Sequence, residues 1–419
     1  MRTVMHIDAN SAYLSWTAVD LLEKGYSVDV RTVPSAIAGD PGERRGIILT
    51  KSISAKRQGI LTGESIRSAM QKCPALLLFA PDYDLYMACS EAMHEILSRY
   101  SNRIERYSVD ESWLDYTGSG VSQEDAVSVA YQIKDCIKKE LGFTVNIGVS
   151  INKLLAKMAS EMKKPDMVHT LFPHEISGKM WPLPVKELFF VGRATEKKLK
   201  GIGIETIGAL AAADEEVIKA VLKPVHGSLV WGYAHGRDDA PVAMVNVINQ
   251  KGVGNSTTTP FDVRDPEDAN LFLLALAERV AHRLRKLSSY ARVVHVSIRR
   301  GDEGLTFAGR QRRLDRYIGT TDEIYVEAKY LLFSIWKGEP LRHFGIHVTE
   351  LMREDRLQTS VFDRDGVDRL VCLDKAVDRV RSIYGDRSIV RGAFVQSGVD
   401  AIQGGINDGQ YILMGGHSL

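Results

Sequence analysis

The 419-residue sequence has few cysteines and no long apolar run. Its four cysteines lie far apart without the spacing of metal ligands, which predicts free thiols in a reducing compartment, the cytoplasm: Cys73, Cys89, Cys136 and Cys372. No run reaches the roughly 18 apolar residues of a membrane span. The N-terminus has an acid at position 8 in place of a signal peptide's apolar core. We therefore expect no membrane partner.

The chain also lacks a strong charge bias. It has 54 Lys and Arg against 53 Asp and Glu, a net charge of +1, so the whole chain does not predict a polyanionic partner. A nucleic-acid surface would have to come from local clustering of basic residues. With 44% hydrophobic and 26% charged residues, the composition is that of a globular protein. The length suggests roughly two to four domains.

Two adjacent acids interrupt a stretch rich in aromatic and β-branched residues. The segments 104–109 and 112–116 predict two short strands, joined by a tight hairpin that has Asp110 and Glu111 at its tip. Two carboxylates this close repel and raise each other's pKa unless a cation lies between them. An ordinary polar hairpin tip explains this stretch equally well.

A third acid favours a metal site. Residues 2–9 predict a strand that contains Asp8 near its end. If this strand lies beside the hairpin, Asp8, Asp110 and Glu111 form a cluster of three carboxylates. Mg²⁺ prefers such oxygen ligands, and two ions about 3.5–4 Å apart can hold both the attacking and the leaving oxygen of a phosphoryl transfer. We expect two Mg²⁺ ions, for which Mn²⁺ can substitute.

Three motifs together resemble the Y-family, or lesion-bypass, DNA polymerases. They occur in family order and spacing, in a resemblance that covers about residues 1 to 385: His6-Ile7-Asp8-Ala9-Asn10 with Tyr13, Ser108-Val109-Asp110-Glu111, and Gly148-Val149-Ser150-Ile151-Asn152-Lys153. The resemblance implies a multidomain α+β fold like a right hand. Its parts would be a palm (1–27 and 81–168), small fingers (28–80), a helical thumb (169–238), a little finger domain (239–351) and a C-terminal tail (352–419).

The resemblance also implies roles for single residues. Asp8 and Asp110 would bridge the two metal ions, the Ala9 carbonyl would complete one site, and Glu111 would bind the catalytic ion. Five residues would bind the incoming nucleotide: Ala12, Tyr13, Thr50, Lys56 and Lys164. Tyr13 matches the steric gate, a ring that excludes a ribose 2′-hydroxyl. Without the resemblance, Tyr13 would be predicted as a core aromatic and Lys56 as a solvated charge.

Two further regions indicate DNA binding. Residues 181–235 predict a small helical unit similar to a helix-hairpin-helix, whose Gly-containing turn would contact DNA phosphate through Gly192, Arg193, Gly201 and Gly203. Phe190 occupies the place where relatives often have the first of two glycines, and a simple helix–loop–helix is the alternative.

The second DNA-binding region has the pattern β-α-β-β-α-β, which predicts a sheet with two helices on one side. Between positions 279 and 316 it has eleven basic residues and three acids. This is the charge expected of a surface that binds the phosphate backbone, although a solvated charged face is the alternative. We expect DNA contacts from Arg299, Arg300, Arg310 and Arg312.

The segment Gln358-Thr359-Ser360-Val361-Phe362 resembles the short peptide by which bacterial polymerases bind the sliding clamp. Gln358, Val361 and Phe362 would be its clamp-binding residues, with Val361 in place of the usual Leu. An aliphatic and an aromatic anchor would then enter a preformed pocket on the clamp.

Together these features predict a template-directed, low-fidelity translesion DNA polymerase that adds dNTPs to a primer 3′-OH. It would act on primer-template DNA in DNA damage tolerance, repair and replication, as a mutator without proofreading. We expect a bacterial enzyme that is cytoplasmic, nucleoid-associated and monomeric. The sequence is equally compatible with an enzyme that needs accessory subunits. The alternatives are a nucleotide cyclase with a similar carboxylate pair, and a non-catalytic DNA- or clamp-binding scaffold.

Overall fold

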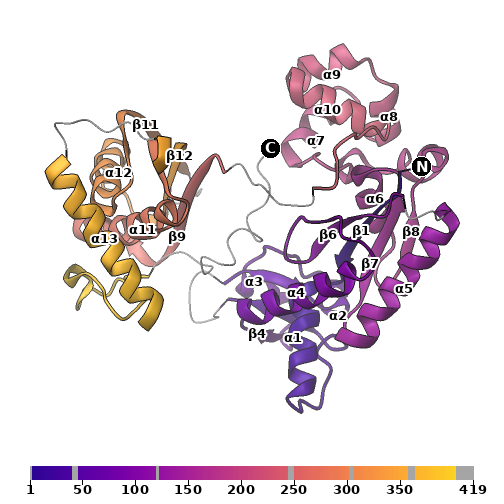
Figure 1. Ribbon diagram of the computed structural model, residues 1–419, viewed down its shortest axis with the longest axis horizontal. Helices are drawn as coiled ribbons and strands as arrows, with labels where there is room; N and C mark the ends of the chain where they lie inside the picture. Colours follow the sequence, from indigo (N-terminus) through magenta and orange to yellow (C-terminus); the bar gives the residue numbers. More distant parts are fainter. Residues whose placement is uncertain are drawn as a thin grey trace. The chain divides into compact units, whose positions relative to one another are not determined.

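The computed structural model describes residues 2–39, 46–118, 122–243, 250–301, 306–356 and 364–402. The chain divides into two compact units (Figure 1). The N-terminal unit contains the described residues 2–39, 47–118 and 122–243, and the C-terminal unit those from 250 to 402. None of the described helices combines the length and the apolar character needed to cross a membrane.

A five-stranded sheet forms the centre of the N-terminal unit, in the order β5-β6-β1-β7-β8. Its strands are β1 (Val4–Ala9), β5 (Ile104–Arg106), β6 (Glu111–Asp115), β7 (Val145–Ser150) and β8 (Val168–Thr170). β8 runs parallel to β7, and the other neighbours are antiparallel. β1 is the middle strand and all six of its residues are buried. The predicted hairpin is confirmed, because β5 pairs with β6.

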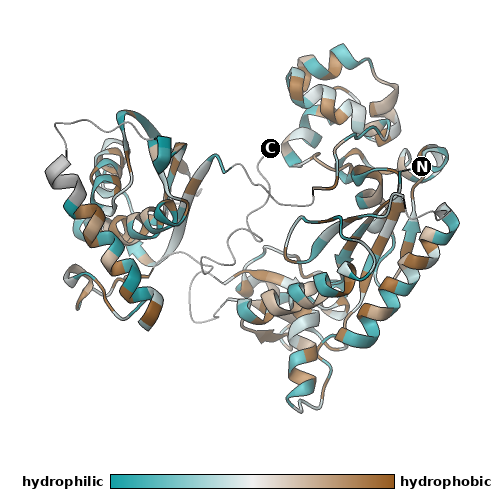
Figure 2. Ribbon diagram, in the orientation of Figure 1, coloured by the Kyte–Doolittle hydropathy of each residue, from teal (hydrophilic) through white to brown (hydrophobic). Residues whose placement is uncertain are grey.

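Helices cover both faces of this sheet. α1 (Ala12–Glu23), α4 (Tyr83–Ser98) and α5 (Gln123–Leu141) pack with Met5 and Ile7 in one core, and polar and apolar residues alternate along α5 in Figure 2. α6 (Lys153–Ser160) lies on the opposite face, where a Cβ added to Gly148 would be 1.9 Å from the Ala156 carbonyl oxygen. Both faces need such cover, because β1 buries side chains on both sides.

A second, three-stranded sheet has the order β3-β2-β4, with β2 (Ser35–Ala38), β3 (Ile48–Lys51) and β4 (Leu77–Phe79). The short helices α2 (Ile53–Arg57) and α3 (Ile66–Lys72) accompany it. Each begins after a serine whose side chain accepts a hydrogen bond from a backbone N–H of the first turn. The chain turns after α2 at Gly59, which has a φ of 80°.

The rest of the N-terminal unit is helical. Short 3₁₀ and π turns span Pro173–Glu175, Ile176–Met180 and Val185–Glu187, and are followed by α7 (Arg193–Lys200), α8 (Ile207–Ala212), α9 (Glu215–Leu222) and α10 (Pro224–Ala234). These helices share an apolar core with α6. α7 to α10 lie within residues 181–235, where the sequence predicted a small helical unit.

The C-terminal unit has the predicted β-α-β-β-α-β order. Its antiparallel sheet, β11-β10-β12-β9, consists of β9 (Gly252–Val263), β10 (Ser289–Arg300), β11 (Phe307–Ile318) and β12 (Leu341–Arg353). α11 (Pro266–Lys286) and α12 (Thr321–Ile335) pack on it through one apolar core. A 3₁₀ turn, Glu354–Arg356, follows β12.

One further helix completes the C-terminal unit. α13 (Arg364–Tyr384) and a 3₁₀ turn over Gly392–Phe394 lie in the predicted C-terminal tail. Arg285 of α11 forms ion pairs with Asp374 and Asp378 of α13, at 2.8 and 2.7 Å. Phe394 and Val399 belong to the apolar core of the unit. The segment after β12 is therefore packed on the rest of the C-terminal unit.

Candidate active site

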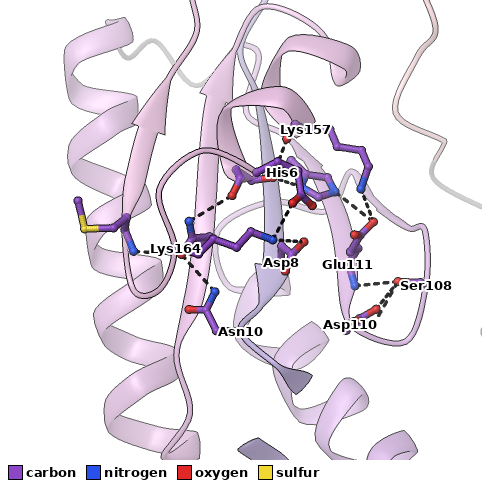
Figure 3. A network of polar contacts seen from close by, with 12 residues as sticks. His6, Asp8, Asn10, Ser108, Asp110, Glu111, Lys157 and Lys164 are labelled. Atoms are coloured by element: carbon purple, nitrogen blue, oxygen red, sulfur yellow. Dashed lines mark hydrogen bonds and ion pairs between the residues drawn. The ribbon is translucent and has the colours of Figure 1, made fainter. Parts of the chain in front are cut away.

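Three acids come together where β1 and β6 lie side by side. In the antiparallel register Asp8 is opposite Glu111, and the Ala9 N–H donates to the Asp110 carbonyl at 3.0 Å. Carboxylate oxygens of Asp8, Glu111 and Glu161 lie within 4.8 Å of one another. Figure 3 shows Asp8, Asp110 and Glu111 with their polar contacts. We call Asp8, Asp110, Glu111 and Glu161 the acidic rim. Sequence reasoning found three of its members and missed Glu161, which directly follows α6.

The Asp110 carboxylate is oriented differently from the other three. It accepts a hydrogen bond from Ser108 Oγ at 2.6 Å, and the Ser108 hydroxyl oxygen also accepts from the Glu111 N–H at 3.1 Å. Burial raises the pKa of Asp110, and the charge of Glu111 raises it further, whereas the Ser108 hydrogen bond opposes this shift. Asp110 therefore lies next to the group of three carboxylates without belonging to it.

Two lysines contact the rim. Lys164 Nζ lies 3.1 Å from Asp8 and 3.0 Å from Glu161. Lys157 Nζ lies 2.7 Å from Glu111 Oε2. Lys164 was predicted as a triphosphate ligand; Lys157 was not predicted. The signal that could have found it is a single charge within the otherwise small and apolar residues 154 to 160, since a lysine in such a run needs a buried partner.

Burial controls the ionisation of the rim. It raises the pKa of Asp8 well above the usual range, and Glu111 and Glu161 raise it further against the effect of Lys164. Burial also lowers the pKa of His6 to about 4, so this imidazole is neutral at pH 7. Burial acts to raise the pKa of Glu111 as well, but the neighbouring His6 and Lys157 outweigh it and hold that pKa below the usual range.

The charge of the rim suits a divalent cation. Four carboxylates meet two ammonium groups here, a formal charge of −2 when all are ionised: Asp8, Asp110, Glu111 and Glu161 against Lys157 and Lys164. Uncompensated charge is costly in a mostly buried site. Carboxylate oxygens are also the ligands that Mg²⁺ and similar hard cations prefer. The residues present therefore fit such an ion.

Tyr13 is fixed by other aromatic residues. Its ring stacks on Tyr86 of α4 with centroids 4.4 Å apart and planes 6° apart, and Tyr83 meets it edge-on at 6.4 Å. Burial raises the pKa of Tyr13, and the charge of Asp110 adds to the shift, so the phenol lies near the rim. Ser11 precedes α1 in a left-handed conformation, with a φ of 47° and no side-chain cap.

Thr50 and Lys56 belong to the second sheet region of the N-terminal unit. Thr50 lies on β3 opposite Ile37, and Lys56 is an exposed residue of α2. Across the described ranges, no hydrogen bond or ion pair joins either residue to the acidic rim. The structure therefore places these two predicted nucleotide ligands in the same unit as the rim but apart from its contacts.

The glycines predicted to contact DNA flank α7. Gly192 is the residue before the helix and Gly201 the residue after it, while Gly203 needs its positive φ of 81°. Arg193 is exposed. Phe190 has a φ of 70°, and its ring packs 4.4 Å from Phe189. The missing glycine is therefore replaced by a residue whose strained backbone is offset by aromatic packing.

The positive charge of the C-terminal unit is smaller than its sequence count indicated. Acids from outside the counted segment pair with many of its arginines: Arg279 with Asp386, Arg285 with Asp374 and Asp378, Arg300 with Glu339, Arg312 with Glu327, Arg313 with Glu350 and Arg316 with Glu323. Arg299 lies over the Phe307 ring, and Arg310 is exposed on β11. Gln358, Val361 and Phe362 lie outside the described residues.

Comparison with known proteins agrees with this geometry. The impB/mucB/samB family matches residues 7–161, and the C-terminal domain of that family matches residues 250–361. A DNA polymerase IV of Clostridium acetobutylicum is 42% identical over 94% of this chain and 98% of that protein. DNA polymerase IV 1 of Bacillus subtilis is 35% identical over 94% of this chain and 93% of that protein.

Solved structures agree on the fold. A Y-family DNA polymerase chimera of Dbh and Dpo4 matches with a TM-score of 0.70 and 20% identity, over 84% of this chain and 99% of the other. The insertion ternary complex of Dbh DNA polymerase matches with a TM-score of 0.54 and 21% identity, over 84% and 99%. The chain therefore belongs to the impB/mucB/samB family, that is, to the Y-family of lesion-bypass DNA polymerases.

Proposed function

We propose that this chain is a template-directed, low-fidelity translesion DNA polymerase that adds dNTPs to a primer 3′-OH. As a Y-family member it is a DNA-directed DNA polymerase. The observation that carries the proposal is the pairing of Asp8 with Glu111 across two adjacent strands, beside Asp110. This arrangement concentrates carboxylates at one end of the central sheet, as phosphoryl transfer by metal ions requires.

Y-family polymerases use divalent metal ions, and we propose Mg²⁺ here. Asp8, Asp110 and Glu111 would hold it, with the Ala9 carbonyl as a further ligand. When bound, the metal would lower the pKa of the primer hydroxyl and stabilise charge on the leaving group. The protein's own contribution is the rigid register of β1 and β6, which fixes the carboxylates before the substrates arrive.

The incoming nucleotide would bind beside the rim. The first N–H groups of α1, at Ala12 and Tyr13, lack partners within their own helix and favour phosphate oxygens. Lys164 lies 3.1 Å from Asp8 and is 31% exposed, so its ammonium group is free to turn from the carboxylates to a triphosphate. Thr50 and Lys56 would contact the same triphosphate. Tyr13, held against Tyr86, would be the steric gate.

The remaining assignments rest on the family resemblance and the positions of the elements. The five-stranded sheet would be the palm, the second sheet the fingers, and the helices α7 to α10 the thumb, with Gly192, Arg193, Gly201 and Gly203 on DNA phosphate. The C-terminal unit would be the little finger domain and would bind DNA through its arginines. We also propose that residues 358–362 bind the sliding clamp, and that the enzyme acts as a monomer at the nucleoid.

Primer extension tests the proposal. The wild-type chain is given an undamaged template and a template with an abasic site, with Mg²⁺ and either dNTPs or rNTPs. We expect extension on both templates with dNTPs, and little with rNTPs. Tight DNA binding without any extension would contradict the polymerase assignment and favour a non-catalytic scaffold.

A further inference from the structure

The two lysines of the acidic rim are held in different ways. The Lys164 side chain is 31% exposed, and its ion-pair partners among the described residues are the carboxylates of Asp8 and Glu161. The Lys157 side chain is 10% exposed and donates to Glu111 Oε2 at 2.7 Å. Its Nζ also lies 5.3 Å from the ring centroid of Tyr107 and 5.4 Å from that of Phe189. Lys157 is therefore fixed by both charge and aromatic contacts.

The aromatic contacts come from two different elements. Tyr107 follows β5 just before the acidic hairpin, and Phe189 follows the 3₁₀ turn Val185–Glu187. Their ring centroids are 6.2 Å apart. A desolvated ammonium group is attracted to ring faces within about 6 Å. Moving Lys157 away from Glu111 would lose this attraction as well as the ion pair, whereas Lys164 has no such restraint among the described residues.

The same oxygen of Glu111 is approached from a second side. His6 Nε2 lies 3.6 Å from Glu111 Oε2, and His6 Nδ1 is 2.7 Å from Ser160 Oγ. Ser160 Oγ donates to the Lys157 carbonyl at 2.8 Å, which closes a ring of contacts (Figure 3). Within the described part of the chain no hydrogen bond reaches Glu111 Oε1. Because the neutral His6 ring has its proton on Nδ1, its Nε2 has no hydrogen-bond partner and cannot hold Oε2. Lys157 is therefore the group that holds Glu111 Oε2.

We propose that Lys157 is a positioning residue that fixes the Glu111 carboxylate for metal binding and, by its positive charge, limits how tightly a divalent cation is held there. The inference rests on the proposed function, because Glu111 must be a metal ligand for it to matter. A fixed carboxylate supports turnover, while a nearby ammonium group repels a divalent cation. Loss of Lys157 should therefore change metal affinity and turnover in opposite directions.

The chain provides a matched control one helical turn away. Lys153, also on α6, donates to the Glu105 carboxylate at 2.6 and 2.8 Å and lies 4.4 Å from the Trp113 ring centroid. Its side chain is 15% exposed. The arrangement of helix, carboxylate and ring is the same, but Glu105 is not part of the acidic rim. A purely structural role would make Lys153→Met and Lys157→Met equivalent.

The test is an Mn²⁺ titration of the full-length, metal-free chain by calorimetry, followed by steady-state kinetics with primer-template DNA. Lys157→Met should bind Mn²⁺ about three- to tenfold more tightly than wild type. Its kcat should fall roughly 10- to 100-fold with little change in the KM for dNTP. Lys157→Arg, which keeps the charge, should bind Mn²⁺ within about twofold of wild type. Lys153→Met should leave both the Mn²⁺ affinity and kcat unchanged.

An unchanged Mn²⁺ affinity in Lys157→Met, or equal effects of Lys153→Met and Lys157→Met, would overturn the inference. If Lys157→Met does not fold, Lys157→Gln tests the charge alone: it keeps a donor for Oε2, so it should bind Mn²⁺ more tightly than wild type while its kcat falls less than that of Lys157→Met. Asp8→Asn separates this inference from the proposed function. If Asp8→Asn binds Mn²⁺ as well as wild type does, the metal site itself is refuted. If Asp8→Asn loses Mn²⁺ binding while Lys157→Met has no effect, only the role of Lys157 is refuted.

Discussion

The two units of this chain contain buried aspartates whose environments act in opposite directions. In the N-terminal unit the Asp8 side chain is 9% exposed, and burial beside other carboxylates raises its pKa well above the usual range. In the C-terminal unit burial also acts to raise the pKa of Asp378, but contacts from His282 and Arg285 outweigh it and lower that pKa to about 2. Asp8 has too little positive charge around it to offset its burial, whereas Asp378 has enough.

This difference in pKa shift distinguishes a site suited to bind an ion from a site that holds helices together. α11 meets α13 and the segment after it through three arginines and three carboxylates: Arg285, Arg381 and Arg391 against Asp374, Asp378 and Glu278. The acidic rim has four carboxylates for two ammonium groups. Buried ion pairs that satisfy each other hold elements together, whereas an excess of one sign favours a bound ion of the other sign.

Replacing one aspartate in each unit tests this contrast most strongly. Asp8→Asn should lower kcat for dNTP incorporation on the order of 10³-fold, without lowering the midpoint of unfolding. Asp374→Asn should lower that midpoint, because Asp374 accepts hydrogen bonds from Arg285 and from the backbone N–H of Thr321. Thermal unfolding and steady-state kinetics are measured on both variants. A loss of stability in Asp8→Asn equal to that in Asp374→Asn would break the contrast.

Removing the cation between α11 and α13 should have the next largest effect. Arg285→Ala leaves two partly buried carboxylates without their partner, which costs about 3 kcal/mol in the free energy of unfolding. Arg313→Ala is the matched control, because its pair with Glu350 is exposed at 60% and 43%. The control should cost less than about 1 kcal/mol. Urea unfolding gives both values, and similar losses would mean that the α11–α13 contacts are not structural.

The ring beside the rim should govern which sugar is accepted. Tyr13→Ala removes the ring that is stacked on Tyr86, so a ribose 2′-hydroxyl would no longer clash. We expect the preference for dNTP over rNTP, measured as the ratio of kcat/KM values, to fall roughly 100-fold. Tyr13→Phe keeps the ring and should keep the preference. An unchanged ratio in Tyr13→Ala would remove the steric gate from this position.

The pH dependence of stability should have opposite signs for the two aspartates. The lowered pKa of Asp378 stabilises the folded state above about pH 4, and this contribution is lost as pH falls toward 2. Relative to wild type, Asp378→Asn should therefore lose about 2 kcal/mol at neutral pH and recover it in acid. The raised pKa of Asp8 predicts the reverse, since Asp8→Asn gains stability relative to wild type as pH rises above 4. Urea unfolding across pH 2 to 7 measures both differences.

Much of the architecture could be predicted because it depends on local pattern. Alternating and helical spacing of apolar residues predicted the hairpin around Asp110 and the β-α-β-β-α-β order of the C-terminal unit. The acids at strand ends were recognisable for the same reason. Residue roles came from the family resemblance, and all of them remain predictions.

Partners that are distant in sequence could not be predicted. Lys157 meets Glu111 only because α6 packs on the less obvious face of the sheet, and Glu161 reaches the rim from the end of that helix. Charge counting failed in the C-terminal unit for a similar reason. The acids that neutralise Arg279 and Arg285 lie on or after α13, about a hundred positions later in the chain.

The most direct test of the acidic rim is single-nucleotide incorporation by Asp110→Ala at saturating primer-template DNA, with the DNA dissociation constant measured in parallel. Of the four carboxylates in the acidic rim, Asp110 is the one that does not belong to the group formed by Asp8, Glu111 and Glu161. It accepts a hydrogen bond from Ser108. The account predicts that incorporation is abolished while DNA binding stays at the wild-type level. Incorporation at the wild-type rate would contradict it and remove Asp110 from the catalytic site.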